Sequence, residues 1–380
     1  MTAGATLRAD VEALAALDRR SASPGELASA RWCADRLRAA GAATVELAPY
    51  RYQHSFGPAH ALHFAAAALG RLPAAAALAG FELDYSGRAQ PLRRLLPAGE
   101  GANVIARIPA DPSAQRRRKV VIVAHHDAAH TGLMWHPRLA EPGARPDGRP
   151  PFSLLPELAM AAIAVGPRRL RWPARAVLAL ATALSLQVAR GATVPGASDN
   201  ATGVAAAIAL VERLAADRPP GLEVVCLLPG SEESGMGGMA AWIAAEGAAL
   251  DPATTLVLGL DTLGAGDPVV LSAEGPLWRV RYDPADLALA DAGAARAGRP
   301  APRRFRLGGW TDPVLARIAG LPAISLLSLR GNVFSDYHLP TDTPDRVDWD
   351  SVGACLEIAE GTVRAWADGI DSRPAGFPLP

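Results

Sequence analysis

The residue types best able to hold a metal ion follow the strand-like segments of this chain, at the points where those segments end. In chain order these groups are His125-His126-Asp127, Asp199-Asn200, Glu232-Glu233, Asp261 and Asp336-Tyr337-His338. In open α/β sheets the ligand site forms outside the carboxyl ends of the strands, so we expect these side chains to converge. Taken singly, each group also fits a solvated loop or a helix N-terminus. Together, imidazole and carboxylate are the ligands that zinc takes in catalytic sites, where one position stays open for water.

The elements that must position these residues alternate between short β-branched runs and helix-like stretches from residue 103 onward. The predicted strands are 103–108, 120–124, 222–228, 255–260 and 323–327. The predicted helices are 200–216, 236–247, 284–297, 312–319 and 350–367, and residues 1–50 predict two more helices and a strand. This alternation is typical of an α/β fold with a mostly parallel central sheet flanked by helices.

Two apolar regions stand outside this alternation. Residues 61–81 are rich in Ala and Leu and are interrupted by Gly, Arg and Pro, which predicts two short helices. The segment 130–197 is longer than a crossover needs and carries two apolar runs, 154–165 and 176–189. Both runs are shorter than the about 20 residues of a membrane span. We expect a hydrophobic helical insertion that forms a lid; the alternative is a hairpin that contacts a membrane surface through 154–189.

Charge and cysteine content exclude several classes of function. The chain of 380 residues has 38 basic and 38 acidic residues, so we expect no nucleic-acid partner. Lys119 is the only lysine, which leaves almost no candidate for Schiff-base or P-loop chemistry. Cys33, Cys226 and Cys355 lie in apolar surroundings without metal-binding spacing, which indicates reduced, packed thiols. Residues 1–20 lack a signal-peptide pattern, so we expect a cytoplasmic protein, peripheral to a membrane if the hairpin contacts one.

The order of the polar groups and the residue types within each group resemble the motifs of the family 28 metallopeptidases. These are di-zinc exopeptidases that include bacterial aminopeptidases, glutamate carboxypeptidase-like enzymes and glutaminyl cyclases. The matching motifs are His125-His126-Asp127, Asp199-Asn-Ala-Thr-Gly203, Glu232-Glu233, Asp261 and Tyr337-His338-Leu-Pro-Thr-Asp342. The match covers most of residues 100–350. The resemblance implies a zinc exopeptidase-like fold and one catalytic domain over residues 1–380, which includes the apolar segment 61–81 and the insertion 130–197.

The same resemblance implies two zinc ions, or other divalent metals, held by five residues. Asp199 would bridge the ions, with His125 and Asp261 completing one site and Glu233 and His338 the other. Since glutaminyl cyclases keep only one zinc, the intact set favours hydrolysis over cyclisation. A cis peptide between the bridging aspartate and the next residue is a further implied feature.

Three more residues receive roles through the resemblance. Glu232 would be the general base that deprotonates a metal-bridging water to hydroxide. Asp127 would hydrogen-bond the far nitrogen of His125 and set its tautomer. Tyr337 would donate a hydrogen bond to the developing oxyanion, although a tyrosine beside a ligand fits a packing role equally well.

Two neighbouring groups receive ordinary structural interpretations. His126, His130 and His136 add imidazole to the first metal-binding loop, and we expect them to lie at the surface. Thr311-Asp312-Pro313 is expected to cap a helix.

Three functions remain as hypotheses. The first is a zinc-dependent exopeptidase of the aminopeptidase type, acting on a peptide or small amide. The second is a non-peptide amidohydrolase for N-acyl or lipidic amides, whose substrates a hydrophobic lid would select. The third is a non-catalytic or membrane-associated binding protein, against which the complete ligand set argues.

Overall fold

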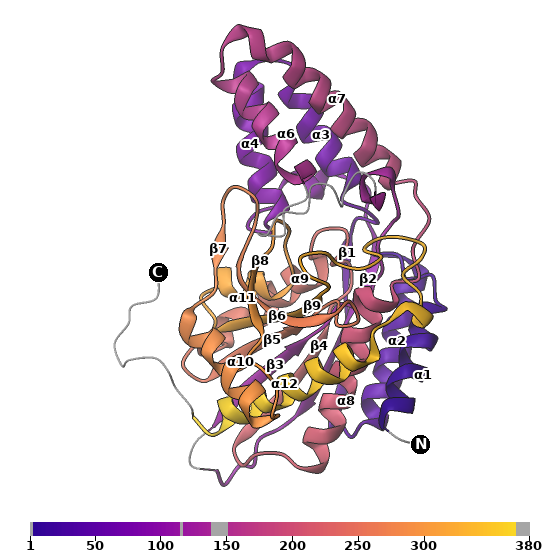
Figure 1. Ribbon diagram of the computed structural model, residues 1–380, viewed down its shortest axis with the longest axis vertical. Helices are drawn as coiled ribbons and strands as arrows, with labels where there is room; N and C mark the ends of the chain where they lie inside the picture. The colour runs from indigo at the N-terminus through magenta and orange to yellow at the C-terminus, as the bar shows by residue number, and fades with distance from the viewer. Residues whose placement is uncertain (1–2, 115–116, 138–150, 370–380) are drawn as a thin grey trace.

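The computed structural model describes residues 3–114, 117–137 and 151–369 (Figure 1). A mixed β-sheet forms the centre, helices cover both of its faces, and four further helices project from one end. Residues 138–150 of the predicted insertion lie outside the described residues, as do residues 1–2 of the first predicted helix.

The sheet has nine strands in the order β1-β2-β4-β3-β5-β9-β6-β7, with β8 paired to β6. Their bounds are β1 Thr44–Tyr52, β2 Gly99–Ile108, β3 Arg118–Val123, β4 Leu222–Leu228, β5 Thr255–Leu260, β6 Asp267–Glu274, β7 Val280–Arg281, β8 Arg303–Arg306 and β9 Ala323–Leu329. The five strands predicted from residue 103 onward are confirmed as β2, β3, β4, β5 and β9. Strand β3 lies between β4 and β5, so Val120 is opposite both Val224 and Leu256.

The prediction of a mostly parallel sheet is wrong, because the sheet is mixed. Strands β4, β3, β5 and β9 run parallel, whereas β1, β2 and β6 pair with their neighbours in the sheet order antiparallel. Only residues 261–266 separate β5 from β6, and a parallel return needs a connection of about a dozen residues or more, so β6 turns back. Strands β6, β7 and β8 are not among the predicted strands, so the antiparallel pairing of β6 with β9 and β7 was not anticipated.

In the described part of the chain, seven helices flank the sheet. Their bounds are α1 Ala3–Ala15, α2 Pro24–Ala39, α8 Thr202–Ala216, α9 Gly237–Glu246, α10 Pro284–Arg296, α11 Pro313–Ile318 and α12 Trp349–Ala367. Helices α1, α2, α8, α10 and α12 lie together on one face, and α9 and α11 lie together against the other (Figure 1). Each helix predicted from residue 200 onward is confirmed within a few residues.

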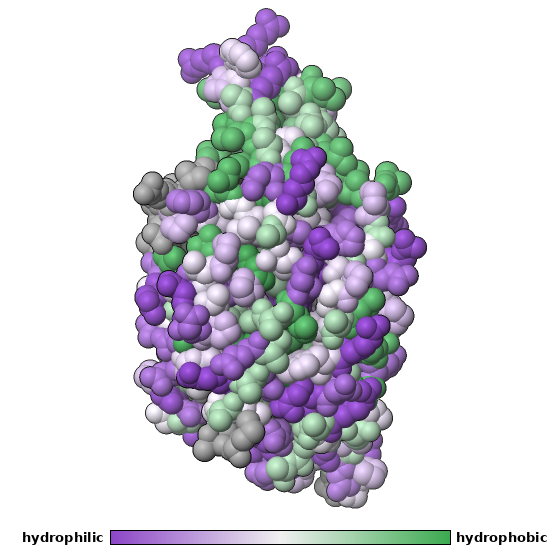
Figure 2. All heavy atoms as spheres, turned by 90° about the vertical axis from the view of Figure 1, so that its right-hand side faces the viewer, coloured by the Kyte–Doolittle hydropathy of each residue, from purple (hydrophilic) through white to green (hydrophobic). Residues whose placement is uncertain are grey.

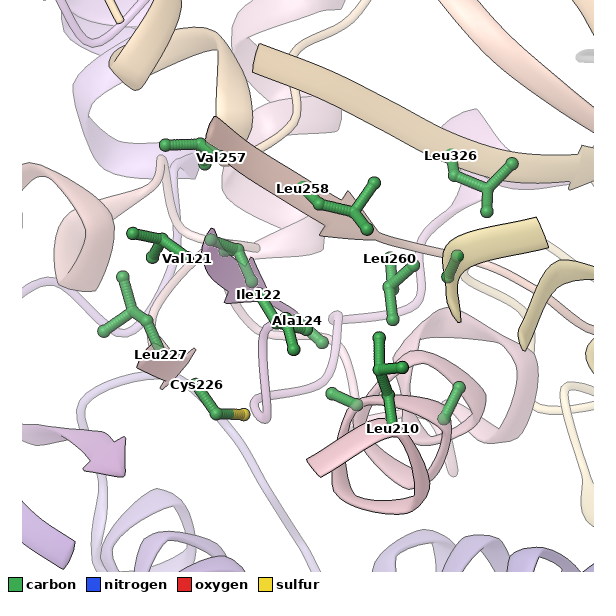
Figure 3. Close-up of a cluster of buried hydrophobic side chains, with 14 of the residues drawn as sticks. Val121, Ile122, Ala124, Leu210, Cys226, Leu227, Val257, Leu258, Leu260 and Leu326 are labelled. Atoms are coloured by element: carbon green, nitrogen blue, oxygen red, sulfur yellow. The ribbon is translucent and has the colours of Figure 1, made fainter. Parts of the chain in front are cut away.

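The main core lies between the central strands and α8. Figure 3 shows Ile122 of β3 and Leu258 and Leu260 of β5 on the side of the sheet that faces Leu210 of α8. All four side chains are essentially inaccessible to solvent. Burying side chains of this kind contributes roughly 1.5–3 kcal/mol each. The carboxyl ends of the strands, where the polar loops begin, are thus held by a rigid support.

Helices α3 Gly57–Ala67, α4 Arg71–Tyr85, α6 Pro151–Ala164 and α7 Arg171–Val188 pack against one another and form what we call the four-helix projection (Figure 1). Their contacts enclose a separate apolar cluster, which includes Phe64, Phe81, Met160, Ile163 and Leu178. The helices predicted around 61–81, 154–165 and 176–189 are therefore present. Of the helices in the described part of the chain, none is long and apolar enough to cross a membrane.

Candidate metal centre

Most of the predicted site residues converge at the carboxyl edge of the central strands. His125 follows β3, Glu232 and Glu233 follow β4, Asp261 follows β5, Asp199 lies just before α8 and His338 follows β9. Since β3, β4 and β5 are parallel neighbours, their ends meet at one edge. Three groups of side chains have ligand atoms close enough to share an ion: His125 with Asp199 and Asp261, Asp199 with Glu233 and His338, and His125 with Glu232 and Glu233.

The carboxylate of Asp199 lies between two histidines. Its Oδ1 is 3.3 Å from Nε2 of His125, and its Oδ2 is 3.2 Å from Nε2 of His338. Asp199 is buried, and its peptide bond to Asn200 is cis, which confirms that implied feature. One carboxylate that offers a separate oxygen to each histidine can bridge two adjacent ions.

The spacing of the ligand atoms fits zinc. Around a tetrahedral zinc ion with bonds of about 2.0–2.1 Å, neighbouring ligand atoms lie about 3.3 Å apart. Nε2 of His338 is 3.0 Å from Oε2 of Glu233, and Nε2 of His125 is 3.8 Å from Oδ1 of Asp261. Nε2 of His338 is also buried and has no hydrogen-bond partner among the described residues. A buried imidazole nitrogen that faces two carboxylates without a hydrogen bond is suited to a metal ion.

Asp127 connects the loop that carries His125 to the paired glutamates. Its Oδ1 lies 3.4 Å from Nδ1 of His125, and its two oxygens accept hydrogen bonds from the backbone N–H groups of Glu232 and Glu233 at 3.1 and 3.2 Å. The hydroxyl of Ser21 donates to the same carboxylate at 2.7 Å. A single buried aspartate thus sets the positions of three site residues.

Asp342, the last residue of the Tyr-His-x-x-x-Asp motif, received no role from sequence reasoning. Its carboxylate accepts hydrogen bonds from the backbone N–H groups of Ser198 at 2.7 Å and Asp199 at 3.1 Å. Its position in the quoted motif was the available signal. The contact fixes the backbone that carries the bridging carboxylate.

Arg19 is a second residue that sequence reasoning missed. Its side chain is fully buried and donates to four backbone carbonyls, those of His126, Asp127, Pro195 and Gly196, at 2.7–3.2 Å. These carbonyls belong to the two loops that carry His125 and Asp199. Arg19 therefore joins the two loops, and no local pattern around it in the sequence indicates this role.

The electrostatics of the cluster reflect its crowded carboxylates. Burial alone would lower the pKa of His125, but Asp127, Asp199 and Asp261 outweigh it and hold that pKa well above the usual range. Burial would raise the pKa of Asp199, but the two facing histidines hold it well below the usual range. Burial, followed by repulsion from nearby carboxylates, raises the pKa of Glu232 well above its usual value. A divalent cation would relieve this excess of negative groups.

Aromatic and aliphatic side chains line the pocket beside the cluster. The lining includes Leu307, Trp310, Leu327, Phe334 and Tyr337. The ring of Tyr337 stacks on that of His338 at 3.8 Å between centroids, and Trp135 packs edge-on against the same imidazole at 4.5 Å. The candidate ligands thus lie on one side of the pocket, and aromatic and aliphatic side chains lie on the other.

Two structural expectations fail here. His126 and His130 are buried rather than at the surface: Nε2 of His126 donates to the carbonyl of Ala102 at 2.9 Å, and His130 lies between two backbone carbonyls. Both imidazoles are buried because their ring nitrogens bond to backbone carbonyls. His136 is exposed, as expected.

The expectation that Asp312 caps a helix through its side chain is also wrong. Asp312 occupies the N-cap position of α11, but its side chain makes no capping hydrogen bond. Both carboxylate oxygens are buried without a hydrogen-bond partner among the described residues. Its neighbours Trp310 and Thr311 line the pocket that His125 and Asp261 share, so Asp312 lies beside the candidate ligands instead.

Comparisons with known proteins agree with this geometry. Residues 179–363 match the model of Peptidase family M28. No curated protein matches the chain in sequence. Among solved structures, an aminopeptidase from Aneurinibacillus sp. strain AM-1 has a TM-score of 0.58 and 14% identity, covering 99% of this chain and 96% of that one.

Two further structures show the same fold. BSAP, a zinc aminopeptidase from Bacillus subtilis, has a TM-score of 0.57 and 15% identity, covering 95% of this chain and 93% of that one. A glutaminyl cyclase from Bacteroides thetaiotaomicron has a TM-score of 0.55 and 13% identity, covering 95% of this chain and 97% of that one. The α/β fold is therefore that of the zinc exopeptidases.

Proposed function

Because the chain is a member of peptidase family M28, we propose that it is a zinc-dependent exopeptidase of the aminopeptidase type, acting on a peptide or small amide. The observation that carries this proposal is the placement of Asp199, whose two oxygens face His125 and His338 at 3.3 and 3.2 Å. A bridge between two ions requires this arrangement. The fold alone carries less weight, since an aminopeptidase and a glutaminyl cyclase share it.

We assign the metal ligands as follows. One zinc ion is held by His125, Asp199 and Asp261, and the second by Asp199, Glu233 and His338, with other divalent metals as substitutes. When bound, such a pair lowers the pKa of a shared water and polarises the substrate carbonyl.

Glu232 is the general base in this proposal. It accepts a proton from the attacking water and returns it to the leaving amine, while a bond forms between the water oxygen and the carbonyl carbon and the C–N bond breaks. Its Oε2 lies 4.0 Å from Nε2 of His125, farther than the oxygen of Glu233 lies from His338. The hydrogen bond from its backbone N–H to Asp127 holds it beside the ligands.

Tyr337 is the proposed oxyanion donor. Burial, and then the nearby carboxylates, raise the pKa of its hydroxyl well above the usual value, so the group stays protonated and able to donate. Its stacking on His338 also gives the ring a packing role. Tyr337→Phe separates the role as oxyanion donor from the packing role, because it removes the hydroxyl and keeps the ring.

The segment 130–197 is proposed as a cover beside the site within one catalytic domain spanning residues 1–380. Trp135 in this segment packs on the imidazole of His338, and the backbone N–H of Leu133 donates to Gln187 at the end of α7 at 2.9 Å. These contacts connect the end of α7 with a metal-binding residue.

The apolar lining of the pocket supports a second candidate, an amidohydrolase for N-acyl or lipidic amides. Leu307 and Phe334, which are half-buried, offer surface for an acyl chain next to the proposed metal ligands. This second candidate has the same proposed metal ligands and the same proposed base. It differs only in the part of the substrate that would lie in the pocket, which is an acyl chain.

One experiment separates these candidates. The zinc-reconstituted protein is assayed against dipeptides, aminoacyl anilides and N-acyl amino acids, with and without a chelator. The exopeptidase proposal expects hydrolysis of the first two classes, abolished by the chelator and restored by zinc. Hydrolysis of N-acyl amino acids alone supports the second candidate, and no hydrolysis of any class by fully metallated protein indicates a binding protein.

A further inference from the structure

Five arginines gather at the outer end of the four-helix projection, at the turns that join its helices. Arg71 starts α4, Arg168 and Arg169 lie in the turn between α6 and α7, and Arg171 and Arg175 lie in the first turns of α7. We call this group the arginine tip. Arg71, Arg168, Arg169 and Arg175 are exposed, and Arg171 is half-buried.

The tip carries uncompensated positive charge. Arg71 donates to the carbonyl of Gly166 at 3.4 Å, and Arg175 donates to the carbonyl of Ala68 at 2.9 Å, so the arginines of the two turns lie close together. Neither 55–81 nor 158–198 contains an Asp or Glu. No ion pair in the described part of the chain includes a tip arginine.

Large apolar side chains surround these charges and face solvent. They are Leu69, Leu72, Val165, Leu170 and Trp172, with exposed fractions of 77, 84, 82, 43 and 77%. Figure 2 shows the hydrophilic outer end of the projection directly above a belt of hydrophobic surface. Apolar groups gathered this way on a surface mark an interaction site.

The charge decides which partner fits. A second copy of the chain that docked tip to tip would bring two groups of five arginines together, which like-charge repulsion opposes. An anionic surface that also accepts Leu and Trp side chains satisfies both features, because guanidinium groups pair with phosphates and tryptophan favours the boundary between head groups and acyl chains. We propose that the arginine tip and its apolar rim dock the protein onto an anionic phospholipid membrane surface.

This contact is peripheral and leaves the metal centre free. None of the described helices can cross a membrane, so the rim enters only the outer part of the bilayer. The opposite end of the projection contacts the metal-centre pocket, where Tyr85 at the end of α4 packs edge-on against Trp310. The membrane surface and the pocket are thus separated by the length of the projection.

Vesicle co-sedimentation of the full chain tests the proposal. We expect binding to vesicles of phosphatidylcholine with roughly one third phosphatidylglycerol, little binding to phosphatidylcholine alone, and release at about 0.5 M salt. The double variant Arg168→Gln/Arg169→Gln should weaken binding about thirtyfold, since each arginine near an anionic surface contributes a factor of about five. Trp172→Ser should weaken binding at every salt concentration.

The matched control is Arg31→Gln/Arg330→Gln, which removes the same charge from exposed arginines of α2 and the end of β9. Circular dichroism and the melting temperature confirm that each variant folds. Equal loss of binding in the control, equal binding to neutral vesicles, or no binding at low salt would each overturn the proposal. A concentration-dependent dimer that Trp172→Ser abolishes would assign the surface to a second copy instead.

Discussion

The carboxylate of Asp342 accepts a hydrogen bond from the backbone N–H of Asp199 at 3.1 Å, across 143 residues of sequence. The same carboxylate accepts a hydrogen bond from the N–H of Ser198, so it holds two successive backbone N–H groups, the second of which belongs to the proposed bridging ligand. Residues that hold metal ligands in place in this way commonly change metal affinity when they are replaced.

We therefore expect Asp342→Ala to weaken zinc binding by about 10–100-fold, measured by competition with a fluorescent chelator. Asp345→Ala, an exposed carboxylate three residues away, serves as the control and should leave the affinity unchanged. Equal affinities for the two variants would show that the hydrogen bonds from Asp342 do not determine the ligand geometry.

Replacing the proposed base should separate metal binding from turnover. Glu232→Gln keeps the shape of the side chain, so zinc content should remain at the wild-type level while kcat falls by roughly 10²–10⁴-fold, as expected for loss of a general base. Near-normal turnover in this variant would remove Glu232 from the mechanism. Glu246→Gln, in a half-exposed ion pair with Arg107, is the control for changing Glu to Gln.

Arg19 should matter for folding far more than its neighbour. Arg19→Met removes four hydrogen bonds, although the carbonyls of His126 and Gly196 keep donors in the hydroxyl of Ser29 and the N–H of Ala201. Because the carbonyls of Asp127 and Pro195 lose the donor that Arg19 supplies, we expect the free energy of unfolding to fall by roughly 2–5 kcal/mol. Arg20 is exposed, so Arg20→Met should change stability by no more than about 0.5 kcal/mol. Urea denaturation of both variants measures the difference, and equal midpoints would refute the role assigned to Arg19.

The sequence was most informative about the central strands and the loops that follow them. Buried strands such as Thr255–Leu260 are continuous apolar runs, and a polar residue such as Asp261 at the end of a run marks both the boundary and the site. Long-range contacts were beyond this reasoning. Nothing near Arg19 in the sequence specifies that it holds a loop more than one hundred residues away. The motif that contains Asp342 marks this residue, but it does not show that the carboxylate holds the backbone of Ser198. The helices of the projection were predicted, but their apolar residues gave no indication of which helices would pack together.

Glu274 should make stability depend on pH. Burial raises the pKa of this carboxyl to about 8, although it accepts hydrogen bonds from Tyr282 and Thr311. The unfolded value is about 4.3. Between these values the folded protein binds one proton more than the unfolded chain, so this group lowers the free energy of unfolding by about 1.4 kcal/mol per pH unit as pH rises from about 5 to about 8.

Glu274→Gln removes that titration. We expect the free energy of unfolding, measured with urea at a series of pH values, to fall with rising pH by about 1.4 kcal/mol per pH unit less in the variant than in the wild type over this range. Glu100→Gln changes an exposed carboxylate and should leave the wild-type slope in place. Parallel curves for wild type and Glu274→Gln would contradict the buried, proton-binding state of this group.

The central claim is that the Asp199 cluster holds two divalent ions, and counting metal tests it most directly. After reconstitution and removal of excess zinc, mass spectrometry of the bound metal should find two zinc ions per chain in the wild type and one or fewer in Asp199→Ala, because a bridging ligand serves both sites. Asp217→Ala, which alters an exposed carboxylate at the end of α8 opposite to Asp199, should keep the wild-type count. Substantially fewer than two zinc ions in the wild type, or an unchanged count in Asp199→Ala, would contradict the account.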